Sequence, residues 1–296
     1  MSLQKELERI AAGMEGTLGL AIRVPHAGDE FRINDQKLFP LASVFKIPLL
    51  VELYNQIERG KLRLDDPVEL TEADRTAGSG VLKEFLPGAR ITVWDLAVLM
   101  MIVSDNMATD ILYRMVDGRQ TVTAQMRRLG LEQIAVPFDC AALLNACVGL
   151  DPYDRTPAVM AEAVRRLRAN EYDLNSIAFE ESLANNCTTA ADMMELLTMI
   201  EQRKVVSPAA CDGMIDIMLR QQLNQRIPLL LPQPAKVAHK TGTLGSTRND
   251  AGIIYLPNGN PIIIAAFTSD VEPANWRQGD MAIAEVALTV YEAYMG

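Results

Sequence analysis

The chain of 296 residues has little of what metal centres and redox sites are built from, with only four cysteines and two histidines. The cysteines form no C-x-x-C pair, so a cysteine–histidine zinc site is not expected. We interpret all four as buried free thiols, and we expect neither a metal nor another cofactor. They are Cys140, Cys147, Cys187 and Cys211.

Basic residues are too few for a protein that binds nucleic acid or an anionic membrane. Lysine and arginine number 28 against 38 acidic residues, which gives a formal charge of −10. Neither partner is therefore expected. No apolar run is long enough to span a bilayer, and the longest, Leu96–Val103, is stopped by Ser104 and Asp105. The composition favours a protein that acts on a small molecule or a peptide.

The N-terminus lacks the apolar stretch of an export signal, because Lys5, Glu6 and Arg9 stand where that stretch would lie. We therefore expect either a cytoplasmic protein or an exported one whose signal this sequence lacks. The sequence leaves the compartment and the oligomeric state open.

Apolar residues make up 49% of the chain, enough for a large core, and the length favours two domains. Strand patterns occur near the two ends of the chain, and Asn258-Gly259 is a strong hairpin signal between the last two. The expected strands are Thr17–Val24, Glu30–Ile33, Ala235–Thr241, Ala251–Leu256 and Pro261–Thr268.

Helical patterns fill the middle of the chain and also occur at both ends. The expected helices are Gln4–Met14, Ala42–Ile57, Trp94–Val103, Ala108–Met115, Gln120–Leu129, Pro157–Ala169, Ala190–Arg203, Pro208–Leu223 and Gly279–Tyr294. This order predicts an α/β fold of the α+β type, in which helices flank an antiparallel sheet and an all-helical lobe is inserted. We expect residues 1–62 and 205–296 to form the α/β domain and residues 63–204 the helical domain.

Ser43 and Lys46 form an S-x-x-K motif at the start of the first strongly apolar helix. Residues three apart lie on one face of a helix, so the hydroxyl and the amine can meet. Serine is a weak nucleophile at its own pKa, but a desolvated lysine can be neutral enough to take its proton. The motif alone is not specific, because Ser2 and Lys5 match it too.

Two further polar motifs follow, and each has an ordinary explanation when taken alone. Ser104-Asp105-Asn106 comes directly after an apolar helix and could be a loop or a cap. Lys240-Thr241-Gly242 ends a predicted strand, where a lysine can simply protect a sheet edge. In this order, however, S-x-x-K, S-D-N and K-T-G are the signature of class A β-lactamases and penicillin-binding proteins.

The sequence resembles this superfamily beyond its three motifs. The segments Phe39–Lys46 and Gly88–Leu96 resemble the family's flanks, and the resemblance runs from about Thr17 to Tyr294. It implies an antiparallel sheet flanked by helices beside an all-helical lobe, in agreement with the pattern of strands and helices.

The resemblance also implies catalytic roles. Ser43 would be the acylated nucleophile, and Lys46 would be the base that activates it. Ser104 would pass a proton to the leaving nitrogen, helped by the positive charge of Lys240. Backbone N–H groups of Ser43 and Thr243 would form an oxyanion hole.

Substrate-binding roles follow from the same resemblance. Asn106 would hydrogen-bond the amide side chain of the substrate. Thr241, Gly242 and Thr243 would face the substrate carboxylate. Arg248 resembles an arginine that some class A enzymes place on the neighbouring strand to bind this carboxylate, although it could also be a surface charge at a strand start.

Deacylation in class A β-lactamases depends on a glutamate in an E-x-x-L-N pattern, and Glu171–Asn175 matches that pattern. We therefore take Glu171 as a candidate for the deacylating base. The stretch between Asn106 and Thr188 is longer than in ordinary members and contains the predicted helix Pro157–Ala169, so the match could be accidental. The alternative for Glu171 is an exposed glutamate at a helix end.

We identify the sequence as a class A β-lactamase-like serine hydrolase that opens the amide of a β-lactam ring through a Ser43 acyl-enzyme. A D-alanyl-D-alanine carboxypeptidase or a small-ester hydrolase is the close alternative, because the fold does not fix the substrate. An alternative of another class is a penicillin-binding sensor that stays acylated. The expected partner is thus a β-lactam or an acyl-D-alanyl-D-alanine-like molecule.

Overall fold

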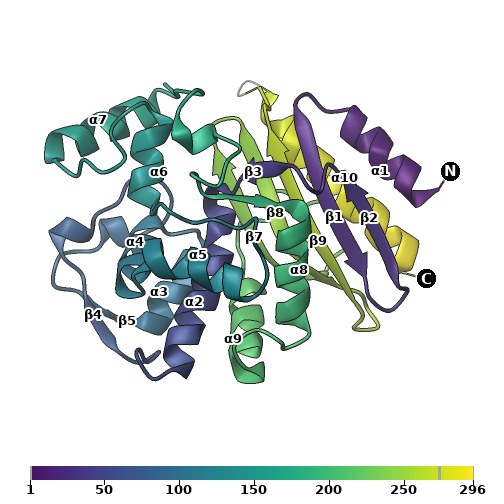
Figure 1. Ribbon diagram of the computed structural model, residues 1–296, viewed down its shortest axis with the longest axis horizontal. Helices are drawn as coiled ribbons and strands as arrows, with labels where there is room; N and C mark the ends of the chain where they lie inside the picture. Colours follow the sequence, from purple (N-terminus) through teal and green to yellow (C-terminus); the bar gives the residue numbers. More distant parts are fainter. Residues whose placement is uncertain (1, 273–274, 296) are drawn as a thin grey trace.

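Strands from the two ends of the chain form one antiparallel sheet, as the sequence predicts. In the computed structural model, which describes residues 2–272 and 275–295, its order is β2-β1-β9-β8-β7 (Figure 1). The predicted turn at Asn258-Gly259 joins β8 to β9, and Gly259 has the positive φ of 86° that glycine adopts readily. The five strands are β1 (Thr17–Val24), β2 (Asp29–Ile33), β7 (Lys236–Leu244), β8 (Thr247–Tyr255) and β9 (Pro261–Ser269).

Helices cover both faces of this sheet. The first and last helices pack together on one face, and two helices from the second half of the chain pack on the other (Figure 1). Because both faces are covered, β8 and β9 are buried along nearly their whole length, and β9 reads as an almost continuous apolar run. The four helices are α1 (Leu3–Ala12), α8 (Ala190–Glu201), α9 (Pro208–Met218) and α10 (Arg277–Tyr294).

The remaining helices lie beside the sheet and form a helical lobe (Figure 1). They are α2 (Lys46–Glu58), α3 (Val93–Ile102), α4 (Asn106–Met115), α5 (Gly118–Arg128), α6 (Cys140–Cys147) and α7 (Pro157–Arg168). Of these, α6 was not predicted, because its sequence CAALLNAC is apolar almost throughout and shows no helical period. The four cysteines are buried and free, as predicted.

Short elements also escaped the sequence patterns. Two pairs of strands are only three residues long, too short to show an alternation of apolar and polar residues. They are β3 (Leu38–Pro40) with β6 (Cys187–Thr189), and β4 (Pro67–Glu69) with β5 (Arg90–Thr92). The 3₁₀ turns are Ala42–Phe45, Glu72–Asp74, Leu82–Glu84 and Ile177–Phe179.

The division into residues 1–62 with 205–296 and residues 63–204 stays a prediction. One element of the middle segment, α8, packs on the sheet against β1, β8 and β9. In the described part of the chain, no helix combines the length and the apolar character needed to cross a membrane.

Candidate active site

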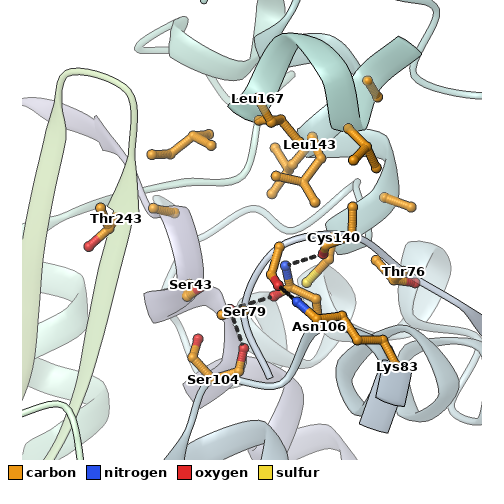
Figure 2. Close-up of a pocket in the computed structure, with 18 of the residues that line it drawn as sticks. Ser43, Thr76, Ser79, Lys83, Ser104, Asn106, Cys140, Leu143, Leu167 and Thr243 are labelled. Carbon is orange, nitrogen blue, oxygen red and sulfur yellow. Dashed lines mark hydrogen bonds between the residues drawn. The ribbon is translucent and has the colours of Figure 1, made fainter. Parts of the chain in front are cut away.

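A cleft of about 720 Å³ opens between the helical lobe and β7, the edge strand of the sheet. Five of the predicted site residues line it, namely Ser43, Ser104, Asn106, Thr241 and Thr243 (Figure 2). Lys46 and Lys240 lie fully buried behind this lining. The fold therefore brings together three motifs that are far apart in the sequence.

Ser43 lies in a 3₁₀ turn rather than in the α-helix that the sequence predicts, because α2 begins only at Lys46. The residue before it, Ala42, has φ 42°, a conformation that costs free energy in a residue with a side chain. The buried Asn249 fixes this turn by donating to the carbonyl oxygens of Pro40 and Leu41, at 2.8 and 3.1 Å.

Gly242 is required where β7 passes this turn. A Cβ atom at this position would lie 2.7 Å from the carbonyl oxygen of Leu41 and 3.1 Å from the nitrogen of Val44. Both atoms belong to the backbone and cannot move aside as a side chain would. The glycine of the K-T-G motif thus lets the edge strand approach the serine turn closely.

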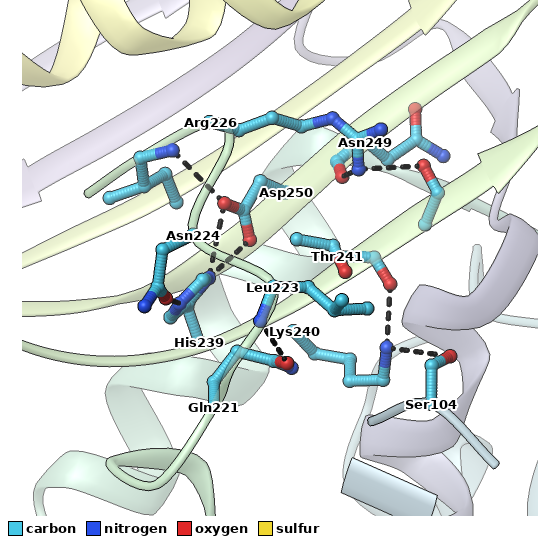
Figure 3. A network of polar contacts seen from close by, with 12 residues as sticks. Ser104, Gln221, Leu223, Asn224, Arg226, His239, Lys240, Thr241, Asn249 and Asp250 are labelled. Carbon is cyan, nitrogen blue, oxygen red and sulfur yellow. Dashed lines mark hydrogen bonds and ion pairs between the residues drawn. The ribbon is translucent and has the colours of Figure 1, made fainter. Parts of the chain in front are cut away.

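The two buried lysines meet at one hydroxyl group. Lys46 Nζ lies 3.0 Å from Ser104 Oγ. Lys240 Nζ lies 3.0 Å from the same oxygen (Figure 3). Lys46 also donates to the carbonyl oxygen of Ser104 at 2.8 Å and to Asn106 Oδ1 at 2.9 Å. Lys240 also donates to the carbonyl oxygen of Thr241 at 2.7 Å.

Burial lowers the pKa of both lysines, because the charged form of an amine loses its hydration inside the protein. The pKa of Lys240 lies well below its ordinary value, and the neighbouring charge of Lys46 lowers it further. For Lys46, nearby acidic groups oppose the lowering without reversing it. The lowered pKa makes it easier for Lys46 to give up its proton and act as a base towards Ser43, three residues earlier in the chain.

Ser104 is arranged to give its proton away. A serine hydroxyl has two acceptor lone pairs and one proton, and the two lysines occupy both lone pairs. Ser104 has φ 55°, and its carbonyl oxygen accepts from Lys46 and from the Ser79 hydroxyl at 2.6 Å, which holds this strained residue in place.

Asn106 is held by a loop that sequence reasoning did not single out. Its Nδ2 donates to the carbonyl oxygen of Ala77 at 2.9 Å, and its backbone N–H donates to that of Ser79 at 3.0 Å. The amide nitrogen carries two protons, so one remains for a ligand in the cleft. Asp105 fixes the same loop by accepting from the N–H groups of Val81 and Leu82.

Arg226 is a second residue that sequence reasoning missed. It is fully buried, pairs with Asp280 at 2.6 Å, and donates to Thr243 Oγ1 at 2.5 Å. Its guanidinium therefore lies directly behind Thr243, on the side of the cleft where Arg248 was expected to act. The sequence alone contains no local pattern that distinguishes Arg226 from the other arginines.

Arg248 is not among the described residues that line the cleft, and its expected role in binding a substrate carboxylate stays a prediction. Its guanidinium donates to the carbonyl oxygens of Gly245 and Thr247, both at 2.8 Å, and its side chain packs near Trp276. It thus closes the turn between β7 and β8. Both of these hydrogen bonds come from Nη1 of the guanidinium.

Glu171 also lies outside the cleft. Its side chain is half exposed and pairs with Arg165 at 2.9 Å, and this arginine lowers the pKa of Glu171. The segment that does line the cleft is Ala141–Asn145 on α6, which keeps Leu and Asn in the last two positions of the E-x-x-L-N pattern. Alanine stands where the pattern has glutamate. A search that tolerated this change would have found the segment.

Asp110 attaches the first turn of α6 to α4. Its carboxylate accepts from the backbone N–H groups of Cys140 at 2.7 Å and Ala141 at 3.1 Å, and from the Thr76 hydroxyl at 2.9 Å. Burial, with the nearby charge of Asp139, raises the pKa of Asp110 to about 7. The wall of the cleft opposite Ser43 therefore rests on a buried group that titrates near neutral pH.

The raised pKa of Asp110 predicts a pH-dependent stability. The folded protein holds this proton more tightly than the unfolded chain, so the free energy of unfolding should fall as the pH rises from about 4 to about 7. One such group changes it by at most about 1.4 kcal/mol per pH unit. Asp110→Asn should abolish this pH dependence, even where the substitution lowers the free energy of unfolding by the same amount at every pH. Urea unfolding at several pH values measures both effects.

The control is Asp216→Asn, which removes a half-exposed carboxylate on α9. Its stability should follow the wild-type pH dependence. If the Asp110→Asn variant follows that dependence too, the pKa of Asp110 is not raised in the folded protein.

The geometry defines a serine hydrolase of the acyl-transfer class, and comparisons with known proteins identify its family. The sequence model of the β-lactamase enzyme family matches residues 2–294. The extended-spectrum β-lactamase PER-1 of Pseudomonas aeruginosa is 27% identical over 300 residues, which cover 98% of this chain and 86% of that protein. The chain belongs to the β-lactamase enzyme family and is a serine hydrolase of the β-lactamase type.

Solved structures agree with this family. A β-lactamase from Sphaerobacter thermophilus superposes with a TM-score of 0.79 at 26% identity, covering 98% of this chain and 96% of that one. The protein PBP-A superposes equally well, with a TM-score of 0.79 over 99% of this chain and 95% of that one, at 24% identity. The expected antiparallel sheet with flanking helices is confirmed.

Proposed function

We propose that the protein opens the amide of a β-lactam ring by acylating Ser43. Lys46 takes the hydroxyl proton as Ser43 Oγ bonds to the ring carbonyl carbon. The carbon–nitrogen bond then breaks, and Ser104 gives its proton to the ring nitrogen and regains one from Lys46. The observation that carries this proposal is the contact of both buried lysines with the Ser104 hydroxyl.

Substrate binding uses the two sides of the cleft. The carboxylate of the β-lactam lies against Lys240, Thr241 and Thr243, with the charge of Arg226 behind them. The free Nδ2 proton of Asn106 binds the carbonyl group of the acylamino side chain. Backbone N–H groups of Ser43 and Thr243 receive the negative charge that develops on the ring carbonyl oxygen.

Hydrolysis of the acyl-enzyme relies on Lys46 in this proposal. Among the described residues that line the cleft, the only carboxylate is that of Glu84, which is exposed. Without a carboxylate at position 141, the amine of Lys46 is the base nearest to the Ser43 ester. We therefore expect acylation to be faster than deacylation.

Intact-mass spectrometry tests the acylation step. Wild-type protein mixed with benzylpenicillin should gain the mass of the whole penicillin, because ring opening loses no atoms. Ser43→Ala should show no adduct, and circular dichroism should show its fold unchanged. An adduct that persists in this variant, or that peptide mapping places on Ser104, would contradict the proposed nucleophile.

Single substitutions at two positions test the deacylation route. Glu171→Gln should leave the lifetime of the acyl-enzyme unchanged, because its carboxylate is on the surface and paired with Arg165. Ala141→Glu should shorten that lifetime, since it adds a general base to the cleft, and such bases contribute about 10²–10⁴-fold. The decay of the adduct mass after removal of free penicillin measures both. A longer lifetime in Glu171→Gln would restore Glu171 as the base.

A peptidase on D-alanyl-D-alanine termini is the second candidate. The observation that favours it is Ala141, because an acyl-enzyme without a nearby carboxylate lives long enough to meet another acceptor. Release of D-alanine from an acyl-D-alanyl-D-alanine peptide, at a rate above that of penicillin turnover, would favour this function.

A further inference from the structure

The cleft continues beyond Asn106 into an apolar chamber between α6 and α7. Its wall is formed by Leu143 of α6 and by four residues of α7; we call these five side chains the apolar lobe. Figure 2 shows Leu143 and Leu167 on the far side of Cys140 from the serine residues. The α7 members are Met160, Ala163, Val164 and Leu167.

The spacing of the α7 residues shows that this helix presents one apolar stripe to the chamber. Positions i, i+3, i+4 and i+7 lie on the same side of a helix, and an amphipathic helix normally buries such a stripe. Here only Ala163 is buried, at 3% exposure, whereas Met160, Val164 and Leu167 are only half-buried. Apolar surface is therefore left facing a cavity.

One polar contact joins α7 to the end of α6, and other pairs lie within α7 itself. On its other side, Glu162 pairs with Arg165 at 2.8 Å and Arg166 at 2.7 Å. Arg166 also donates to the carbonyl oxygen of Val148 at 2.9 Å, which ties α7 to the end of α6.

We propose that the apolar lobe binds the apolar substituent of the acyl group that Ser43 carries, an alkyl chain of several carbons or an aryl ring. This inference rests on the proposed function. It follows from continuity, because the chamber opens beside Asn106, the residue that holds the acylamino group. The five side chains carry no charge, so they favour an apolar occupant over a polar one.

Binding without acylation tests the lobe independently of catalysis. The ligands are 6-aminopenicillanic acids N-acylated with acetyl, butanoyl, hexanoyl or octanoyl groups, and the protein is the Ser43→Ala variant. Titration calorimetry should show Kd falling by about two- to fourfold for each added methylene that becomes buried, up to the size of the chamber. A Kd that does not depend on chain length overturns the proposal.

A substitution that fills the chamber gives the matched comparison. Val164→Trp in the same background should raise Kd for the octanoyl ligand at least tenfold and leave Kd for the acetyl ligand within twofold. Ala161→Asn, on the exposed side of α7, is the control and should leave the chain-length dependence intact. Equal effects of both substitutions, or of Val164→Trp on both ligands, overturn the proposal.

Acylation of the wild-type protein by the same ligands then separates the two claims. If Kd depends on chain length in Ser43→Ala but the wild-type protein forms no adduct, the binding role of the apolar lobe is supported and the proposed function is contradicted. If adducts form at a rate that does not depend on the acyl chain, and Kd does not depend on it either, the proposed function is supported and the binding role of the apolar lobe is contradicted.

Discussion

The shared contact of Lys46 and Lys240 with the Ser104 hydroxyl is the interaction on which the site depends. Two amines buried side by side cannot both keep a full charge without a large loss of hydration and mutual repulsion. Their pKa values are lowered for this reason, and the lowered values give the site a base. The same contact joins the start of α2, the start of α4 and the edge strand β7.

Several other features serve to hold these three elements at contact distance. Gly242 lets β7 approach the serine turn, and Asn249 holds the carbonyl groups that precede Ser43. Ser79 and Lys46 hold the strained backbone of Ser104. The free energy lost in positive φ angles and buried polar groups is thus offset by hydrogen bonds around the same few atoms.

The sequence was sufficient for the sheet, for most helices and for the catalytic motifs, because each depends on a local period or a short fixed pattern. It was not sufficient for Arg226, whose role arises only when a loop folds behind β7. It did not show that Arg248 and Glu171, whose spacing fits a family pattern, make their polar contacts outside the residues that line the cleft. Ala141–Asn145 was missed because the glutamate that makes the pattern visible is absent.

The alanine at position 141 and the helix α7 together distinguish this cleft from one that follows the E-x-x-L-N pattern without an added helix. One removes a carboxylate from the wall opposite Ser43, and the other adds an apolar chamber next to it. Both changes concern the acyl-enzyme rather than its formation: the first affects how fast the ester is hydrolysed, and the second which acyl group is held.

The central claim is that burial lowers the pKa of Lys46 and so lets its amine take the Ser43 proton, and the pH dependence of acylation tests it most directly. The rate constant for adduct formation with benzylpenicillin, measured by rapid quench and intact mass, should rise with pH because only the neutral amine accepts a proton. Its midpoint should lie below about 10.4, the ordinary pKa of lysine. A midpoint at or above that value would contradict the account.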